Sequence, residues 1–157
     1  MSDFQIVIGT DILVSDYSHN IDTVFFIHYQ GKSFPCERWT DFSYPILNTW
    51  TNLMLRNTYN DHARYDLFFQ DGPYKMIIRK TLANLEIDCI HLNQNTIELS
   101  FECTFLHFLS ALYDAHKTLS NILYQNGLHL GMFKPAYEQT ILTTKELKLA
   151  IKKLKSI

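Results

Sequence analysis

The sequence predicts an α+β fold in which an antiparallel β-sheet of about six strands packs against helices on one face. Two patterns lead to this prediction. From position 63 to 105, apolar and polar residues alternate, as in strands with one buried and one wet face, and short turns interrupt the alternation. In two further segments, apolar residues recur every three to four positions, as in amphipathic helices. The predicted order of elements is β-β-α-β-β-β-β-α-α.

The first two strands are predicted within the first 30 residues. Residues 4–14 and 23–29 are rich in Ile, Val and Phe, and a polar stretch at 15–20 separates them. Gly31 ends the second run. These segments supply two of the six strands.

The first helix is predicted to begin near Ser43. Ser43 suits a cap, and Pro45 suits the first turn, where a missing N–H costs little. The apolar residues that follow form one stripe: Ile46, Trp50, Leu53 and Met54. The polar segment 57–61 ends this helix.

A four-strand meander is predicted between residues 63 and 105. Turns are expected at 71–73, where Asp, Gly and Pro favour a chain reversal, and at 93–95. The last strand has the most regular alternation. Its inward side chains are predicted to be Ile97, Leu99, Phe101 and Cys103, and its outward side chains Glu98, Ser100, Glu102 and Thr104.

Two helices are predicted to complete the chain. The second helix spans 105–126, with Gly127 as its C-terminal cap. Thr143 and Glu146 have the spacing of a capping box, which predicts a last helix over 144–156. We find no linker, repeat or low-complexity segment, so residues 1–157 are predicted to form a single domain.

Composition and charge argue against several classes of protein. A net charge of −2 does not suit a general nucleic-acid binder, which neutralises phosphates with a basic field. No apolar run approaches the roughly 18 residues of a membrane span. Asp3 stands where a signal peptide would carry Lys or Arg. We therefore expect a cytoplasmic protein with no membrane partner. Its three widely spaced cysteines, expected to be reduced, are Cys36, Cys89 and Cys103.

The sequence offers no assembled catalytic or metal site. Its five glycines are isolated, which excludes a phosphate-binding loop. A turn at 93–95 would pair Cys89 near Leu99 and leave Cys103 too far along its strand to share a zinc ion with Cys89. We interpret Cys89, Cys103 and His91 as core residues and see no histidine pair suited to acid–base catalysis. We expect neither a cofactor nor enzymatic activity; a small hydrolase or nuclease is a third possibility, for which the sequence offers no candidate histidine pair.

Four carboxylates are predicted to project from the wet face of one hairpin: Glu86, Asp88, Glu98 and Glu102. The ordinary interpretation is that Lys75 and Arg79 on the preceding hairpin offset their charge. The alternative is an acidic docking face for a basic partner, where complementary charge speeds association and selects partners. A flat sheet face would be a poor setting for catalysis by paired acids.

A resemblance to a known family rests on three segments: Arg38-Trp39-Thr40-Asp41-Phe42, the helix with Leu47 and Trp50, and Phe68-Phe69-Gln70-Asp71-Gly72-Pro73-Tyr74. Together, over roughly residues 23–126, they resemble small bacterial immunity proteins encoded beside contact-dependent growth inhibition toxins and other polymorphic toxins. Some members of this group resemble the Whirly single-stranded-DNA-binding fold, which also sets helices against an antiparallel sheet. Within the pattern, we interpret Trp39 and Trp50 as core anchors and the segment 71–73 as a turn.

The resemblance implies a stoichiometric inhibitor that binds one cognate toxin, often a nuclease, and blocks its active site or substrate surface. The partner would be the C-terminal nuclease domain of the toxin. We place the interface on the outer sheet face and its nearby turns. The candidate toxin-binding residues are Glu86, Asp88, Glu98, Glu102, Asp71 and Phe68.

An alternative function is a single-stranded nucleic-acid-binding module that uses the same sheet face. Lys75 and Arg79 would contact phosphates, and Phe68 and Tyr74 would stack on bases. The four carboxylates on that face weigh against this alternative, so we expect no direct contact with nucleic acid.

Overall fold

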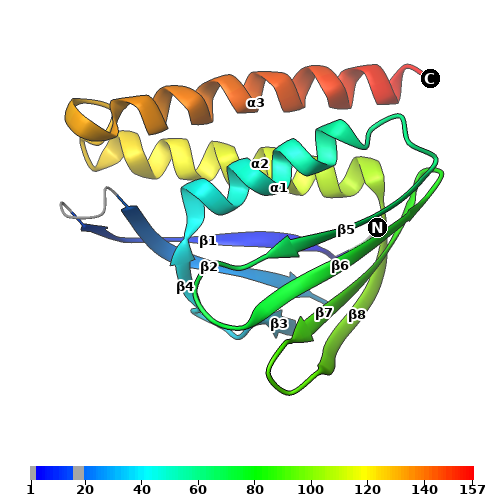
Figure 1. Ribbon diagram of the computed structural model, residues 1–157. Coiled ribbons are helices and arrows are strands. Elements are labelled where there is room, and N and C mark those ends of the chain that lie inside the picture. Colours follow the sequence, from blue (N-terminus) through cyan, green and yellow to red (C-terminus); the bar gives the residue numbers. More distant parts are fainter. Residues whose placement is uncertain (1–2, 16–19) are drawn as a thin grey trace.

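The computed structural model describes residues 3–15 and 20–157, and within them two antiparallel sheets lie beneath three α-helices. The helices lie on the same side of both sheets, and α3 lies farthest from the strands (Figure 1). This arrangement confirms the predicted α+β class. The predicted connection at 15–20 falls largely outside the described residues.

The first sheet is built on the long antiparallel pair β1 (Gln5–Ser15) and β2 (Asn20–Tyr29). The other edge of β2 pairs with two short strands, first β3 (Lys32–Phe34) and then β4 (Thr40–Phe42). These two strands were not predicted. They bring the number of described strands to eight. The sequence did not reveal them because a pairing of three residues is too short to show a period of two.

The second sheet is the predicted meander. Its strands are β5 (His62–Phe68), β6 (Tyr74–Thr81), β7 (Asn84–His91) and β8 (Thr96–Thr104), which lie side by side in chain order. Cys89 pairs with Leu99, as predicted, and Cys103 lies opposite Leu85.

The prediction that Ile97 points inward is wrong, because β8 contains a bulge. Cys89 pairs with Leu99, but the next residue, Ile90, pairs with Ile97, so Glu98 is an extra residue on β8. A bulge changes the face on which the following side chains lie. Ile97 therefore shares the outer face with Ile90 and is 60% exposed.

Two of the helices begin where predicted. Helix α1 (Ser43–Arg56) follows β4 directly, and α2 (Phe105–Gln125) follows β8, where the Thr104 side chain accepts a hydrogen bond from the His107 amide. Ser43 is already the first helical residue and caps nothing.

The predicted start of the last helix is wrong. After a short 3₁₀ turn (Gly131–Phe133), α3 (Lys134–Lys155) begins ten residues before position 144, with Pro135 in its first turn. Thr143 lies inside the helix and is buried, as is Thr140. The Thr140 hydroxyl donates to the Ala136 carbonyl, which satisfies it within the helix. The capping-box pattern was therefore coincidental.

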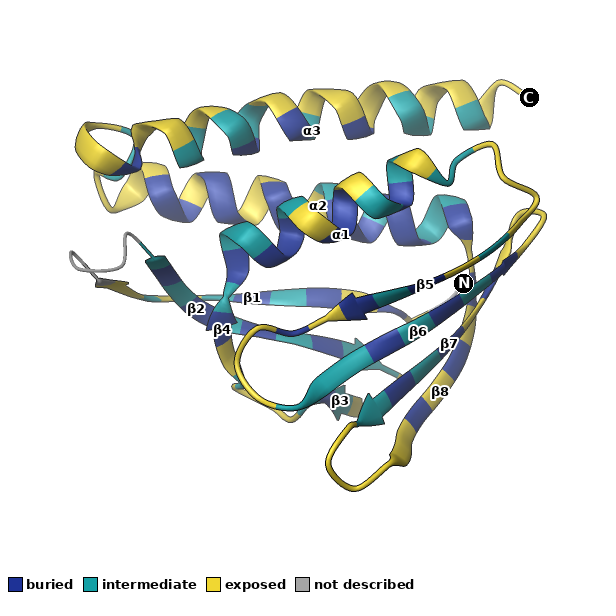
Figure 2. Cartoon of the chain, viewed as in Figure 1, coloured by how far each residue is buried: buried dark blue, intermediate teal, exposed yellow. Residues whose placement is uncertain are grey.

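The core lies between the inner faces of the two sheets and the helices above them (Figure 2). Phe25 from β2, Trp50 from α1 and Phe69 after β5 form an edge-to-face cluster with ring centroids 5.3 to 5.9 Å apart. Trp50 also donates its indole N–H to the Phe68 carbonyl at 3.0 Å. Trp50 is thus a core anchor, as predicted.

Asp41 connects the two sheets through its carboxylate. Oδ1 accepts from the amides of Phe42 at 2.8 Å and Asp71 at 3.0 Å. Oδ2 accepts at 3.2 Å from the Trp39 indole and from the Gln70 amide. Burial raises the pKa of Asp41, although these four hydrogen bonds act in the opposite direction.

The Trp39 ring covers the turn that Asp41 holds. A Cβ placed on Gly72 would lie 2.9 Å from the ring, and Gly72 has a φ of +87°, so both space and conformation require glycine there. Tyr74 packs edge-to-face on Trp39, with centroids 5.1 Å apart. The segments that carry the family resemblance therefore contact one another.

The end of α1 is closed by Lys80, which points inward from β6. Its ammonium group donates to the carbonyls of Asn57, Thr58 and Asn60, which follow the helix. Burial lowers the pKa of Lys80.

In the described part of the chain, no helix is both long enough and apolar enough to cross a membrane.

Helices α1 and α2 are joined by a buried polar pair. Thr51 Oγ1 and His116 Nε2 are 2.8 Å apart, and both side chains are buried. Burial lowers the pKa of His116 to about 4, because imidazolium is poorly solvated there, and the nearby Leu47 backbone offsets only part of this shift.

Substituting Asp41→Asn is expected to destabilise the fold. One acceptor oxygen becomes an amide group that faces two N–H donors, which should cost about 2 kcal/mol of unfolding free energy in urea titration. The matched control is Asp71→Asn, because the Asp71 side chain is exposed and only its backbone N–H contacts Asp41. Equal losses in the two variants would contradict the role assigned to the carboxylate.

Stability should fall in mild acid because of His116. The pKa of His116 is about 4 in the folded protein and about 6.5 in the unfolded chain, so the unfolded chain binds more protons between these two pH values. The stabilisation is complete above pH 6.5 and is lost as the pH falls towards 4, with about 2 kcal/mol lost between pH 7.5 and 5. Urea titrations at the two pH values test this. The His116→Gln variant should show a clearly smaller difference; an unchanged difference would assign it to other groups.

Candidate functional site

The outer face of the second sheet, meaning the β5–β8 side chains that point away from the core, carries most of the candidate residues. The strand register arranges these side chains in three rows across the sheet. The first row is Phe68, Lys75, Ile90 and Ile97. The second row is Asp66, Ile77, Asp88 and Ser100. The third row is Arg64, Arg79, Glu86 and Glu102.

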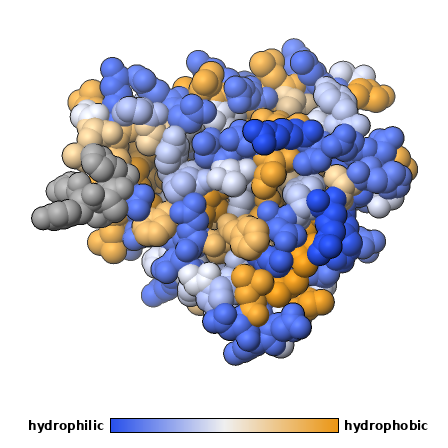
Figure 3. All heavy atoms as spheres, viewed as in Figure 1, coloured by the Kyte–Doolittle hydropathy of each residue, from blue (hydrophilic) through white to orange (hydrophobic). Residues whose placement is uncertain are grey.

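The first row makes one end of the outer face apolar. Phe68, 52% exposed, and Ile97, 60% exposed, lie at the two edges of this row. Ile77 of the second row is half-buried and lies diagonal to Phe68 and to Ile90. Lys75 lies over the Phe68 ring, with its nitrogen 5.5 Å from the ring centroid. Hydrophobic side chains gather over the lower part of this sheet in Figure 3, next to strongly hydrophilic ones.

Asp88 lies at the centre of an ion-pair network. Its carboxylate accepts from Arg79 Nη2 and from the Ser100 hydroxyl, both at 2.7 Å. Burial alone would raise the pKa of Asp88, but the hydrogen bonds from Ser100 and Arg79, together with the arginine charge, lower it below its usual value. Arg79 also reaches Glu86 at 3.3 Å. For Glu86 and Asp88, the geometry supports the ordinary interpretation of charge compensation by Arg79.

The remaining charges of this face are distributed unevenly. Lys75 pairs with Asp66 at 2.8 Å rather than with a β7 or β8 acid. Among the described residues, Arg64, Glu98 and Glu102 have no ion pair, and all three are exposed. The β5–β6 half thus carries an unpaired arginine, and the β7–β8 half carries two unpaired glutamates.

Asp71 is not brought together with the other candidate acids. It lies in the exposed turn after β5, where its charge and, more strongly, burial raise the pKa of Asp22 on β2. Asp71 therefore belongs to the junction between the two sheets. Of the six candidate residues, the structure places Glu86, Asp88, Glu102 and Phe68 in the rows of the outer face and Glu98 at the bulge beside them.

Three apolar residues of this face were not among the sequence-based candidates. Ile77 and Ile90 could have been found, because they alternate with the inward residues of their strands. Ile97 could not, because only the bulge exposes it.

Three of the four residues of the nucleic-acid alternative are engaged within the chain, whereas the fourth, Phe68, is 52% exposed. The Lys75 and Arg79 cations contact carboxylates at 2.7 to 3.3 Å. Tyr74 packs edge-to-face against three rings: Phe34, Trp39 and His91. Phosphate binding by Lys75 and Arg79, or base stacking on Tyr74, would have to break these contacts.

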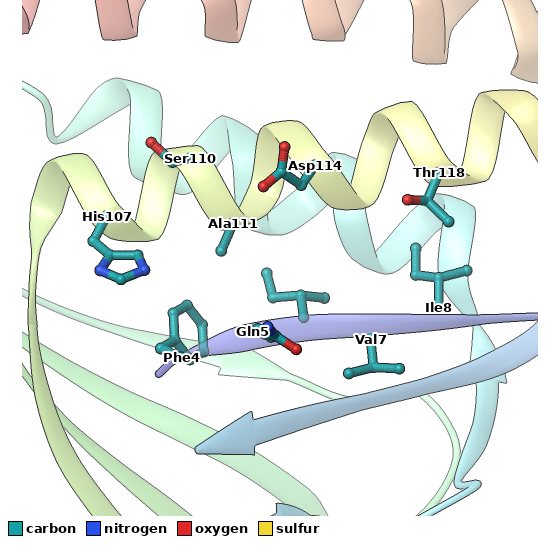
Figure 4. Close-up of a pocket in the computed structure, with 10 residues that line it drawn as sticks. Phe4, Gln5, Val7, Ile8, His107, Ser110, Ala111, Asp114 and Thr118 are labelled. Carbon is teal, nitrogen blue, oxygen red and sulfur yellow. The ribbon is translucent and has the colours of Figure 1, made fainter. Parts of the chain in front are cut away.

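A hollow of about 360 Å³ lies between the edge strand β1 and α2. Figure 4 shows His107, Ser110, Asp114 and Thr118 along the α2 wall above β1. His107 and Asp114 are seven residues apart, which is about 10 Å of helix rise and too far for the hydrogen bond of a catalytic pair. The Ser110 hydroxyl donates to the Leu106 carbonyl at 2.9 Å.

The buried thiols are poor ligands and nucleophiles. Burial raises the pKa of Cys103 to about 12, and it raises that of Cys89 together with the charges of Asp88 and Glu98. The part of the chain that the structure describes contains no group of three or more metal-ligating side chains.

Comparisons with known protein families, with curated proteins and with solved structures give no match to this chain.

The two acids that share Arg79 should contribute unequally to stability. Asp88→Asn removes a short ion pair, whereas Glu86→Gln removes a longer and more exposed one. We expect a loss of about 0.5 to 1 kcal/mol for Asp88→Asn and almost none for Glu86→Gln, because water screens exposed pairs. Urea titration at low and high salt measures both. A larger loss for Glu86→Gln would contradict the assigned network.

Proposed function

We propose that this protein is a bacterial immunity protein that binds and neutralises a cognate toxin in the cytoplasm. The partner is the nuclease domain of a contact-dependent growth inhibition toxin, and inhibition is stoichiometric. The observation that carries the proposal is the outer face itself, in which exposed apolar side chains on a rigid sheet adjoin unpaired acids.

The apolar part of this face has the properties of an interface centre. Phe68, Ile90 and Ile97 lie in one row on hydrogen-bonded strands, so their burial by a partner needs little ordering of the backbone. The row lies at one end of the face, next to the charged rows, and protein–protein interfaces typically combine buried apolar side chains with charged residues at their rim. An inhibitor that docks through this row gains affinity from burial without forming a pocket.

The acids provide selectivity for a basic partner. Glu98 and Glu102 are exposed and have no ion pair among the described residues, so a partner cation can reach them without displacing an existing contact. A nuclease holds phosphates with a basic surface. The β7–β8 half of the face therefore suits such a surface by charge.

The packing of the resemblance segments is consistent with this proposal. Trp39, Asp41 and the 70–72 turn contact one another and fix the end of β5. These residues thus have a structural role in placing the outer face, and no contact with the toxin is needed to explain them.

Calorimetric titration against the toxin domain encoded beside this gene tests the proposal. We expect a one-to-one complex with nanomolar affinity and loss of toxicity on co-expression. Absence of a complex, or undiminished toxicity, would overturn the proposed function. Salt-dependent binding to single-stranded oligonucleotides instead would favour the nucleic-acid alternative.

Substitutions on the outer face locate the interface. Ile97→Asp and Glu102→Arg should each weaken toxin binding by about tenfold or more, since the first buries a charge and the second repels a basic partner. The matched controls on α3 are Leu149→Asp, at a leucine that is 59% exposed, and Glu146→Arg. If the α3 variants weaken binding and the β8 variants do not, the interface lies on the helices.

A further inference from the structure

We propose that the outer face also binds a second copy of this chain. The two copies are related by a two-fold axis that lies between their faces, parallel to the strands and above the line between β6 and β7. This self-association involves the surface assigned to the toxin, but it requires no toxin. It rests on how charged and apolar residues are distributed across the four strands.

Opposite charges occupy the two edges of one row. Arg64 on β5 pairs in register with Arg79, Arg79 with Glu86, and Glu86 with Glu102 on β8. Three strand spacings of about 4.8 Å put Arg64 roughly 14 Å from Glu102, so these two residues cannot pair within one chain. Neither has an ion pair among the described residues.

A two-fold axis parallel to the strands exchanges β5 with β8 and β6 with β7 while leaving each row opposite itself. Arg64 of one copy then faces Glu102 of the other, and Arg79 faces Glu86. Symmetry produces each contact twice. The acidic half of one face therefore meets the basic half of the other.

The same operation makes the apolar row self-complementary. Phe68 of one copy faces Ile97 of the other, and these are two of the most exposed apolar side chains on the sheet. Lys75 faces Ile90 with its aliphatic stem, because its ammonium group is held by Asp66. Phe68 and Ile97 would bury apolar surface that each copy otherwise leaves in water.

The other face-to-face symmetry is disfavoured by charge. An axis perpendicular to the strands would set the first row against the third. Lys75 would then face Arg79, and Ile97 would face Glu102. Like charges and the desolvation of Glu102, which has no ion pair among the described residues, oppose that arrangement. The parallel axis also sets a carboxylate, Asp88, against Ile77, but Asp88 is already paired with Arg79. The charge pattern therefore favours the parallel axis.

The size of the face predicts a weak dimer. Four strands at about 4.8 Å and seven or eight residues at about 3.3 Å give a face of roughly 20 by 25 Å. Two such faces bury on the order of 1,000 Å² in total, the lower end for specific interfaces. We therefore expect micromolar association. Because the toxin would cover the same face, its binding should release monomers.

Sedimentation velocity on the protein alone tests the dimer. We expect the mean mass to rise from monomer to dimer between low and high micromolar concentration. A monomer over this whole range overturns the inference, and a monomer that still binds the toxin leaves the proposed function intact.

Charge reversal tests the two-fold arrangement. Arg64→Glu and Glu102→Arg each create like-charge contacts at both symmetric positions and should weaken the dimer by about tenfold or more. The double variant should restore it. An equimolar mixture of the two single variants should also restore it, because both contacts of the heterodimer then join an acid to a base.

Restoration cannot arise within one chain, since the two positions lie at opposite edges of the sheet. The controls Glu146→Arg and Lys148→Glu on α3 should leave the dissociation constant unchanged, and circular dichroism verifies folding of every variant. A double variant or a mixture that stays as weak as the single variants overturns the arrangement. A dimer that neither single variant weakens places self-association on another surface and overturns it as well.

Discussion

The buried Asp41 carboxylate is the interaction on which the rest of this structure depends. It joins β4 of the first sheet to residues 70 and 71 of the second through four N–H donors. A carboxylate out of water is tolerated only when such donors surround it. The contact fixes where β5 ends and β6 begins, and hence the register that pairs Phe68 with Lys75 and orders the outer rows.

From that junction, packing decides which side of the second sheet meets water. Aromatic residues of both sheets and α1 interlock at Phe25, Trp50 and Phe69, so the inner faces close on each other beneath the helices. The outer face of β5–β8 is left to solvent. Arg79 and Lys75 compensate Glu86, Asp88 and Asp66 within the chain. Three exposed charges have no ion pair among the described residues: Arg64, Glu98 and Glu102. The paired charges hold one another in place within the face, and the unpaired charges are free to select a partner of opposite charge.

Much of the fold followed from local patterns. The meander, the Cys89–Leu99 pairing and the start of α2 were predicted because one buried face imposes a period of two and one buried stripe imposes a period near 3.6. The extra strands β3 and β4 were missed, since three-residue pairings leave no periodic trace. The start of α3 was wrong because a spacing of Thr and Glu cannot tell a cap from a buried helix interior.

The sequence by itself determined the α+β class and, for most strands, which residues point inward and which outward. It also determined the side of the sheet on which Glu86, Asp88 and Glu102 lie, because these features depend on neighbours along the chain. Tertiary structure alone decided which acids Arg79 pairs with and that Ile97 faces water. It also decided that Asp41 accepts hydrogen bonds from the amides of Gln70 and Asp71, which are distant in the sequence. The physical reason is that a bulge or a buried hydrogen bond between distant segments is set by the fit of packed layers, and no local period encodes that fit.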